Sequence, residues 1–184
     1  VRWRVRGVLP QEGIAAIYGP PGSGKSFLAL DVLAAIATGR PWFGYRVQSA
    51  PVLYVALEGE AGIAQRVQAH QTRHGGAERM RFLAAPLDVR QPTDRADIVR
   101  AAKAAGLAGG VLCIDTLAAS APGMDENTSA DMGEVIAGLK ALQTELGGLV
   151  LAVHHSGKDQ TRGMRGHSSL LGALDAVIEV SRND

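Results

Sequence analysis

The sequence predicts an α/β domain with a doubly wound, mainly parallel sheet, and three observations support this fold class. Five short apolar runs are distributed along the 184 residues. Helical patterns fill the intervals between these runs, and a glycine-rich loop joins the first run to the first helical pattern. Alternating strands and helices are typical of a parallel sheet that is covered by helices on both faces.

The apolar runs are the expected strands. Each is short, rich in Val, Ile and Leu, and continuous rather than alternating, as expected for strands that are covered on both faces. Because ligands of such a sheet bind at the carboxyl ends of its strands, functional residues are expected where each run ends. The five predicted strands are residues 14–18, 52–57, 111–114, 149–153 and 176–180.

The intervening segments have the periodicity and the end signals of helices. The first follows the glycine-rich loop over residues 27–36, and the second covers about 60–74. The third, about 94–105, follows Pro92 and has Thr93 or Asp94 as its candidate N-cap. The fourth has Thr128 or Ser129 as its cap and stops before Gly147.

Composition sets limits on the class of protein. A chain of this length with 46% hydrophobic residues, 4% aromatic residues and 23 glycines suits one globular domain over residues 1–184. No apolar run is long enough to span a bilayer. The single cysteine, Cys113, lies inside an apolar run, which predicts a buried inert thiol and agrees with a reducing cytoplasm. The net charge of +1 neither supports nor excludes a nucleic-acid partner.

The loop after the first strand, GPPGSGKS, is a complete G-x-x-x-x-G-K-[ST] phosphate-binding motif between a strand and a helix. Backbone N–H groups of such a loop surround phosphates, and the helix that begins there points its positive end at them. Lys25 is expected to reach the β- and γ-phosphates, and Ser26 to offer a hydroxyl to Mg²⁺. The motif predicts binding of a nucleoside triphosphate by Gly19, Pro20, Pro21, Gly22, Ser23, Gly24, Lys25, Ser26 and Phe27.

Carboxylates end two further predicted strands. Asp115 follows four apolar residues, which is the Walker B pattern of a carboxylate that holds Mg²⁺ through water, and Thr116 is a candidate for the same metal–water shell. Glu58 ends the second strand, where a base that orients and deprotonates water is expected. Glu60 is the competing candidate, although it also suits the first turn of a helix.

Histidines at strand and helix positions are further candidates. His154 and His155 end the fourth strand, and alternation sends them to opposite faces, so that only one is expected to face a γ-phosphate. A metal site built from these two and His167 lacks supporting Cys or carboxylate spacing. His70 and His74 lie four residues apart on a helix without a third ligand, and we interpret them as surface residues.

The polar segment after His155 carries three cations near the expected phosphates. Lys158, Arg162 and Arg165 could bind a DNA backbone, or one of them could reach the nucleotide of a neighbouring subunit as an arginine finger. A solvated loop is the simpler alternative.

Taken together, these segments resemble the RepA-type branch of the RecA-like P-loop ATPases, which includes hexameric plasmid replicative helicases and phage and mobile-element ATPases. The resemblance covers nearly the whole chain. It rests on Trp3, GVLP at 7–10, GPPGSGKS at 19–26, PWFG at 41–44, LYVALEGE at 53–60, LCIDT at 112–116, DEN at 125–127, HHSGK at 154–158 and RGHSS at 165–169.

This resemblance implies a three-layer α/β/α core that hydrolyses ATP with Mg²⁺, with the Asp115 carboxylate as the metal ligand alongside Ser26. It implies that Glu58 is the catalytic glutamate, that His155 is a strand-end sensor, and that Arg165 reaches a neighbour's γ-phosphate. His167 departs from the family pattern, so Arg162 and Lys158 stay open as the finger. The strand that ends in His155 is expected between the phosphate-loop strand and the Asp115 strand.

The resemblance also implies assembly and a partner. Segments 117–129 and 156–168 are expected to face the channel of a hexameric homo-oligomeric ring and to grip single-stranded DNA. The chain ends soon after its fifth strand, where the family usually adds more, which suggests a catalytic core of a longer protein. A nucleotide-dependent DNA-binding or signalling switch that assembles without unwinding is the alternative, because aromatic side chains for base stacking are absent from both loops.

Overall fold

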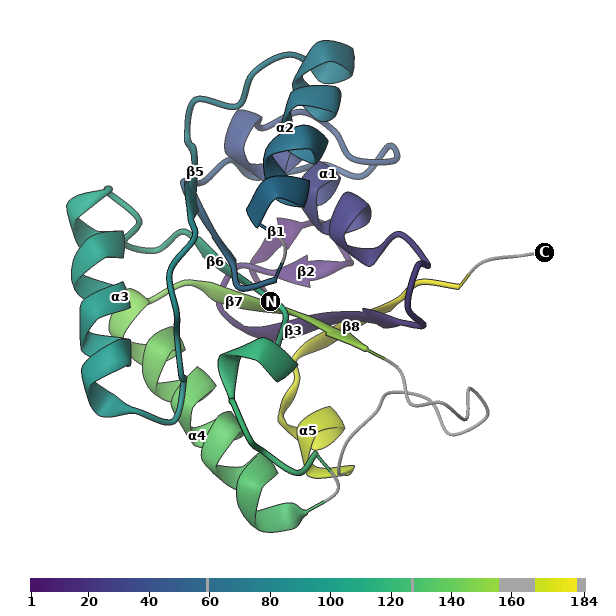
Figure 1. Cartoon of the computed structure of the whole chain (residues 1–184). Coiled ribbons are helices and arrows are strands. Elements are labelled where there is room, and N and C mark those ends of the chain that lie inside the picture. Colours follow the sequence, from purple (N-terminus) through teal and green to yellow (C-terminus); the bar gives the residue numbers. More distant parts are fainter. Residues whose placement is uncertain (59, 127, 156–167, 182–184) are drawn as a thin grey trace.

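The chain is built around one six-stranded parallel sheet, shown in Figure 1. The computed structural model describes residues 1–58, 60–126, 128–155 and 168–181. All five neighbouring strand pairs are parallel. From one edge to the other, the strands are β5 (Met80–Leu83), β4 (Val52–Ala56), β6 (Val111–Asp115), β7 (Leu149–His155), β3 (Gly13–Gly19) and β8 (Ala176–Glu179).

Helices cover both faces of this sheet and make three layers. One core cluster joins α1 (Lys25–Thr38) and α2 (Glu60–His74) to the first face, and a second cluster joins α3 (Pro92–Ala104), α4 (Ser129–Leu146) and α5 (Ser168–Ala173) to the other. A short 3₁₀ turn, η1 (Ala118–Ser120), follows β6. The predicted three-layer α/β/α class is therefore confirmed. Among the described helices, none combines the length and apolarity that crossing a bilayer requires.

Successive residues of each strand enter the two cores alternately. In β7, Leu151 and Val153 pack with α1, whereas Val150 and Ala152 pack with α4. The same alternation continues to the carboxyl end of the strand, so His155 lies on the α1 face. This periodicity decides which strand-end side chains can meet the phosphate loop.

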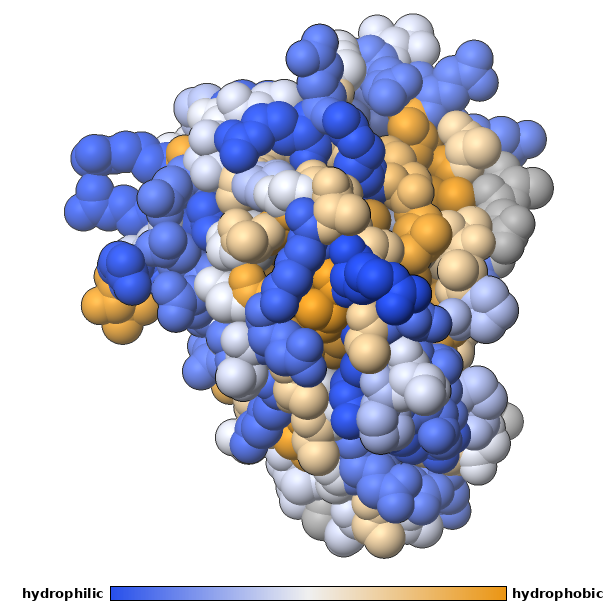
Figure 2. Space-filling model, turned by 90° about the vertical axis from the view of Figure 1, so that its left-hand side faces the viewer, coloured by the Kyte–Doolittle hydropathy of each residue, from blue (hydrophilic) through white to orange (hydrophobic). Residues whose placement is uncertain are grey.

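All five predicted strands are present, and β7 lies between β3 and β6 as the resemblance implied. Three strands were not predicted. β1 (Trp3–Val5) and β2 (Leu9–Pro10) form a small separate antiparallel sheet, and β5 lies at the edge of the main sheet. β5 is short and exposes Arg81 and Phe82, so it lacks a continuous apolar pattern. In Figure 2, which views the β5 side, hydrophobic areas are broken up by hydrophilic side chains.

Two details of the elements differ from expectation. β8 is an edge strand that alternates half-buried and exposed residues, rather than a strand covered on both faces. α3 begins at Pro92 with Gln91 as its N-cap, and Asp94 accepts a hydrogen bond of 2.9 Å from the backbone N–H of Asp88 instead of capping the helix. α4 behaves as expected, because Thr128 caps its start.

Candidate functional site

The phosphate loop joins the end of β3 to the start of α1. Gly22 and Gly24 have φ values of 74° and 92°, a left-handed backbone conformation that side-chain-bearing residues rarely adopt. Lys25 is the first residue of α1, is only 5% exposed, and donates a hydrogen bond of 2.7 Å from Nζ to the Pro20 carbonyl. The motif therefore folds into the strand–loop–helix arrangement on which phosphate binding depends.

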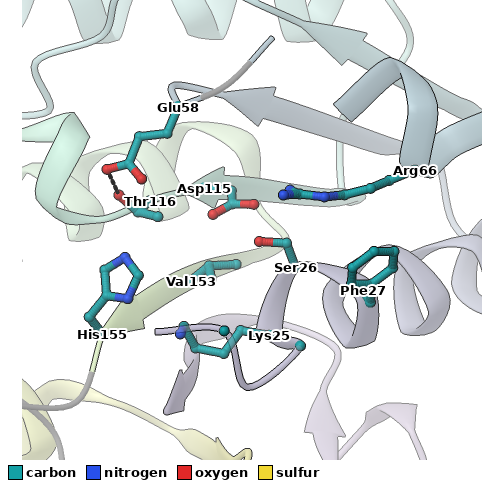
Figure 3. Close-up of a pocket in the computed structure, with 11 residues that line it drawn as sticks. Lys25, Ser26, Phe27, Glu58, Arg66, Asp115, Thr116, Val153 and His155 are labelled. Carbon is teal, nitrogen blue, oxygen red and sulfur yellow. Dashed lines mark hydrogen bonds between the residues drawn. The ribbon is translucent and has the colours of Figure 1, made fainter. Parts of the chain in front are cut away.

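An open pocket of about 290 Å³ lies at the carboxyl ends of β4, β6 and β7, above this loop (Figure 3). It collects most of the side chains that the sequence singled out. Gly19, Pro20, Pro21 and Ser23 belong to the loop without lining the pocket. The predicted residues that line it are Gly22, Gly24, Lys25, Ser26, Phe27, Glu58, Asp115 and His155.

The charge of Lys25 depends on two opposing influences. Burial lowers the pKa of this ammonium, while the nearby carboxylates of Asp115 and Glu58 raise it. The carboxylates thus help to keep the amino group protonated in a confined position. A protonated lysine at the start of a helix suits an anionic ligand.

Asp115 is held from below by the neighbouring strand. It is 7% exposed, and the hydroxyl of the fully buried Tyr54 donates a hydrogen bond to its Oδ2 atom. Burial, then the proximity of Cys113 and of Asp115, raises the pKa of Tyr54, so the phenol stays protonated and remains a donor. This contact fixes the orientation of the carboxylate.

The oxygen donors at the pocket suit Mg²⁺. Asp115 has no ion-pair partner among residues 1–58, 60–126, 128–155 and 168–181, although it is buried and accepts a hydrogen bond only from a neutral phenol. Its carboxylate and the hydroxyl of Ser26 face each other in Figure 3. Hard cations of this kind prefer oxygen ligands and bind through one or two carboxylates plus phosphate oxygens. These residues therefore fit the cation that the phosphate loop implies.

Glu58 follows β4 and is exposed on the rim of the pocket. Its Oε1 atom accepts a hydrogen bond of 2.7 Å from the hydroxyl of Thr116, which is 4% exposed. The sequence suggested that Thr116 would bond to the metal–water shell, but its hydroxyl is directed to Glu58. Glu60, the competing candidate, is the first residue of α2.

His154 and His155 are separated as strand alternation predicted. His154 is fully buried, whereas His155 is half-buried and lines the pocket. The Nδ1 atom of His155 has no hydrogen-bond partner within the described part of the chain. A ring nitrogen available at the pocket could bond to a phosphate oxygen.

Arg66 is a pocket residue that the sequence reading missed. It lies on α2, lines the pocket, and its guanidinium carbon lies 5.4 Å from the centroid of the Phe27 ring. Figure 3 shows the guanidinium pointing toward Asp115. The available signal was that α2 follows β4 closely, so a basic residue in its second turn lies beside the carboxyl ends of the strands.

The cations after β7 fall in a different category. Lys158, Arg162, Arg165 and His167 lie outside the described residues, so the predicted finger and most of the segment 156–168 stay predictions.

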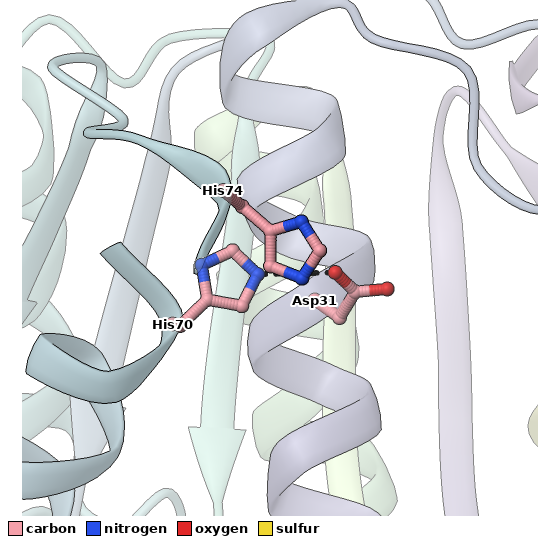
Figure 4. A group of neighbouring side chains, drawn as sticks. All are labelled: Asp31, His70 and His74. Atoms are coloured by element: carbon pink, nitrogen blue, oxygen red, sulfur yellow. Dashed lines mark hydrogen bonds and ion pairs between the residues drawn. The ribbon is translucent and has the colours of Figure 1, made fainter. Parts of the chain in front are cut away.

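His70 and His74 are not simple surface residues. His70 donates to or accepts from Oδ1 of Asp31 at 3.0 Å, and the two rings are 4.7 Å apart (Figure 4). Asp31 supplies the third ligand type that the sequence lacked. Its Oδ1 is also paired with Arg40 at 2.7 Å, and a guanidinium there opposes a metal cation. The cluster is therefore an ion-paired network between α1 and α2.

Comparisons with known proteins agree with this geometry. The AAA_25 family, described as an AAA domain, matches residues 1–161. A solved structure of the ATPase domain of a helicase superposes with a TM-score of 0.67 at 15% identity, covering 94% of this chain and 70% of that one. No curated protein matches the chain. Because the family match extends over most of its length, the chain belongs to the AAA_25 family and is a RecA-like P-loop ATPase of the RepA type.

Proposed function

We propose that this domain hydrolyses ATP with Mg²⁺ and is the motor core of a ring-forming helicase that acts on single-stranded DNA. One observation carries the hydrolytic part of the proposal. Lys25, Glu58 and Asp115 reach a single pocket from three separate strand ends. Binding alone needs only the loop and a metal ligand, so a third, exposed carboxylate favours turnover over simple binding.

Each residue has a distinct role in this proposal. Lys25 and the loop N–H groups bind the β- and γ-phosphates and stabilise the charge that develops on them. Glu58 orients a water and accepts its proton as the water oxygen attacks the γ-phosphorus and the bond to the β–γ bridging oxygen breaks. Ser26 and Asp115 would hold Mg²⁺, which when bound offsets negative charge on the phosphates. His155 reports the presence of the γ-phosphate through a hydrogen bond.

The proposed ring supplies what one subunit lacks. Arg165, or Arg162 or Lys158 in its place, reaches the nucleotide of the next subunit and stabilises the transition state. An isolated domain should then hydrolyse ATP slowly. The likeness to a helicase ATPase domain and the resemblance to ring helicases support this part of the proposal.

Two substitutions test the hydrolytic roles. Glu58→Gln should retain binding of a fluorescent ATP analogue and lose at least about 100-fold in turnover, because a general base contributes about that much or more. Lys25→Ala should weaken binding itself. Glu145→Gln on α4, a residue outside the pocket lining, is the matched control. Full turnover by Glu58→Gln would refute the assignment of the base.

The ATP-dependent switch without unwinding is the second candidate, favoured by the composition of segment 117–129. It contains Asp125 and Glu126 but no Lys, Arg or aromatic residue, a poor composition for gripping DNA. ATPase rate measured against protein concentration, with and without single-stranded DNA, separates the candidates. A motor requires a steep rise with concentration and stimulation by DNA, followed by strand separation in a longer chain. ATP-dependent DNA binding without strand separation supports the switch.

A further inference from the structure

We propose that Thr116 positions the catalytic base: its hydroxyl holds Oε1 of Glu58, so that Oε2 is left to accept the proton of the attacking water. The inference rests on the proposed function of Glu58 and adds a residue on which the base depends. The two residues lie 58 positions apart in the chain, and their side chains meet at 2.7 Å beside the pocket (Figure 3).

Chemistry fixes the direction of this hydrogen bond. The backbone N–H of Ala119 can only donate, and it reaches Oγ1 of Thr116 at 3.3 Å. An ionised carboxylate can only accept, so the single hydroxyl proton of Thr116 points to Glu58. The chain of bonds from Ala119 through Thr116 to Glu58 has one polarity. The same proton is then unavailable to a metal-bound water.

Thr116 is well placed to hold another side chain still. It is buried, it is β-branched with a restricted χ1, and its carbonyl accepts a hydrogen bond of 3.2 Å from the N–H of Ser120 in η1. The strand exits are also tied together, because the N–H of Leu57 donates to the Asp115 carbonyl at 2.7 Å. Thr116 is therefore a fixed point beside a mobile type of side chain.

Glu58 depends on this one anchor. The residue is exposed, and the Thr116 hydroxyl is the only hydrogen-bond partner of its carboxylate in the part of the chain that the structure describes. Without the anchor, a glutamate with three rotatable bonds samples many rotamers, and misplacement by about 1 Å costs about 100-fold in rate. Loss of the hydroxyl should therefore lower kcat while leaving nucleotide affinity intact.

The decisive variant is Thr116→Val, which keeps the shape of the side chain and removes its donor. We expect kcat of ATP hydrolysis to fall about 10- to 100-fold. The Kd for mant-ADP and the Mg²⁺ concentration at half-maximal rate should stay within about 2-fold, because neither depends on Glu58. Thr116→Ser should recover most of the lost kcat. Thr72→Val, an exposed threonine on α2, controls for a threonine-to-valine change.

A double-mutant cycle shows whether Thr116 acts through Glu58. In a Glu58→Gln background, adding Thr116→Val should change single-turnover hydrolysis less than about 3-fold, because the base is already lost. An unchanged or raised kcat in Thr116→Val overturns the inference, and so does a shift in the Mg²⁺ requirement, which would return Thr116 to the metal shell. If Glu58→Gln itself turns over normally, the proposed function fails instead.

Discussion

The hydroxyl of Tyr54 donates a hydrogen bond to Oδ2 of Asp115, from β4 to β6 and beneath the pocket. The sheet register explains the contact. Tyr54 is paired with Cys113, two residues before Asp115, and both side chains lie on the α1 face. The carboxylate that is expected to hold Mg²⁺ is therefore oriented by a side chain that never reaches the nucleotide.

Tyr54→Phe should consequently raise the Mg²⁺ requirement of ATP hydrolysis. A hydrogen bond to a charged group contributes about 1.5–3 kcal/mol, and part of that is lost from the metal-binding orientation of Asp115. We expect the Mg²⁺ concentration at half-maximal rate to rise about 5- to 50-fold, with kcat at saturating Mg²⁺ largely recovered. A Mg²⁺ titration of steady-state ATPase activity measures this. An unchanged titration curve would show that Tyr54 only fills space.

Arg66 should contribute to nucleotide affinity. Its guanidinium lies at the pocket against Phe27, and a fixed cation there attracts phosphate oxygens. Arg66→Ala should weaken ATP binding about 10-fold, and Arg66→Lys should fall between, because lysine keeps the charge without the planar fork. Isothermal titration gives both affinities. Arg73→Ala, at the exposed far end of the same helix, should bind ATP normally.

Asp31 should stabilise the fold in a pH-dependent way. Burial acts to raise the pKa of this carboxyl, but hydrogen bonds from His70, Arg40 and Trp42 prevail and lower it below 3.8. Because the folded-state pKa lies below that of the unfolded chain, the stabilisation is present above about pH 4 and disappears as the pH falls through the folded-state pKa.

Asp31→Asn should therefore lower the free energy of unfolding by about 1–3 kcal/mol at pH 7, and Tm by about 2–10 °C. The difference from the parent chain should shrink in urea titrations carried out below about pH 4. Asp97→Asn is the matched control, because Asp97 pairs with Arg100 on the surface at 68% exposure and should have almost no effect. Equal losses in both variants would contradict a special role for the Asp31 network.

Cys113 should be inert in the native protein. It is fully buried, and burial followed by the charge of Asp115 raises the pKa of its thiol. A disulfide-exchange reagent such as DTNB should label it only as fast as the chain opens, and labelling should become rapid in denaturant. Fast labelling in buffer would show that β6 is exposed far more often than its central place in the sheet suggests.

Contiguous signals were the ones that could be predicted. The phosphate loop is a single segment in which strand, glycines and helix follow one another, so local rules describe it almost completely. The central strands were predicted because both of their faces are buried, whereas β5 was missed because an edge strand needs no continuous apolar run.

Residues that act from other segments could not be predicted as reliably. Glu58 and Asp115 were found because strand ends share one edge of a parallel sheet. Arg66 carried no motif, and Asp31 gave no sign that it would meet two histidines from α2. Such pairings depend on how helices pack on the sheet, which short-range patterns do not encode.

Local chemistry along the chain was enough to place a triphosphate on the loop before Lys25, because the residues that make this site are neighbours in sequence. The order β4–β6–β7–β3 and the alternation of side chains decided the rest. They set Tyr54 under Asp115, turned His155 rather than His154 toward the pocket, and brought Thr116 to Glu58. Long-range packing selects these contacts, because only the closed core fixes the register between strands that are far apart in the chain.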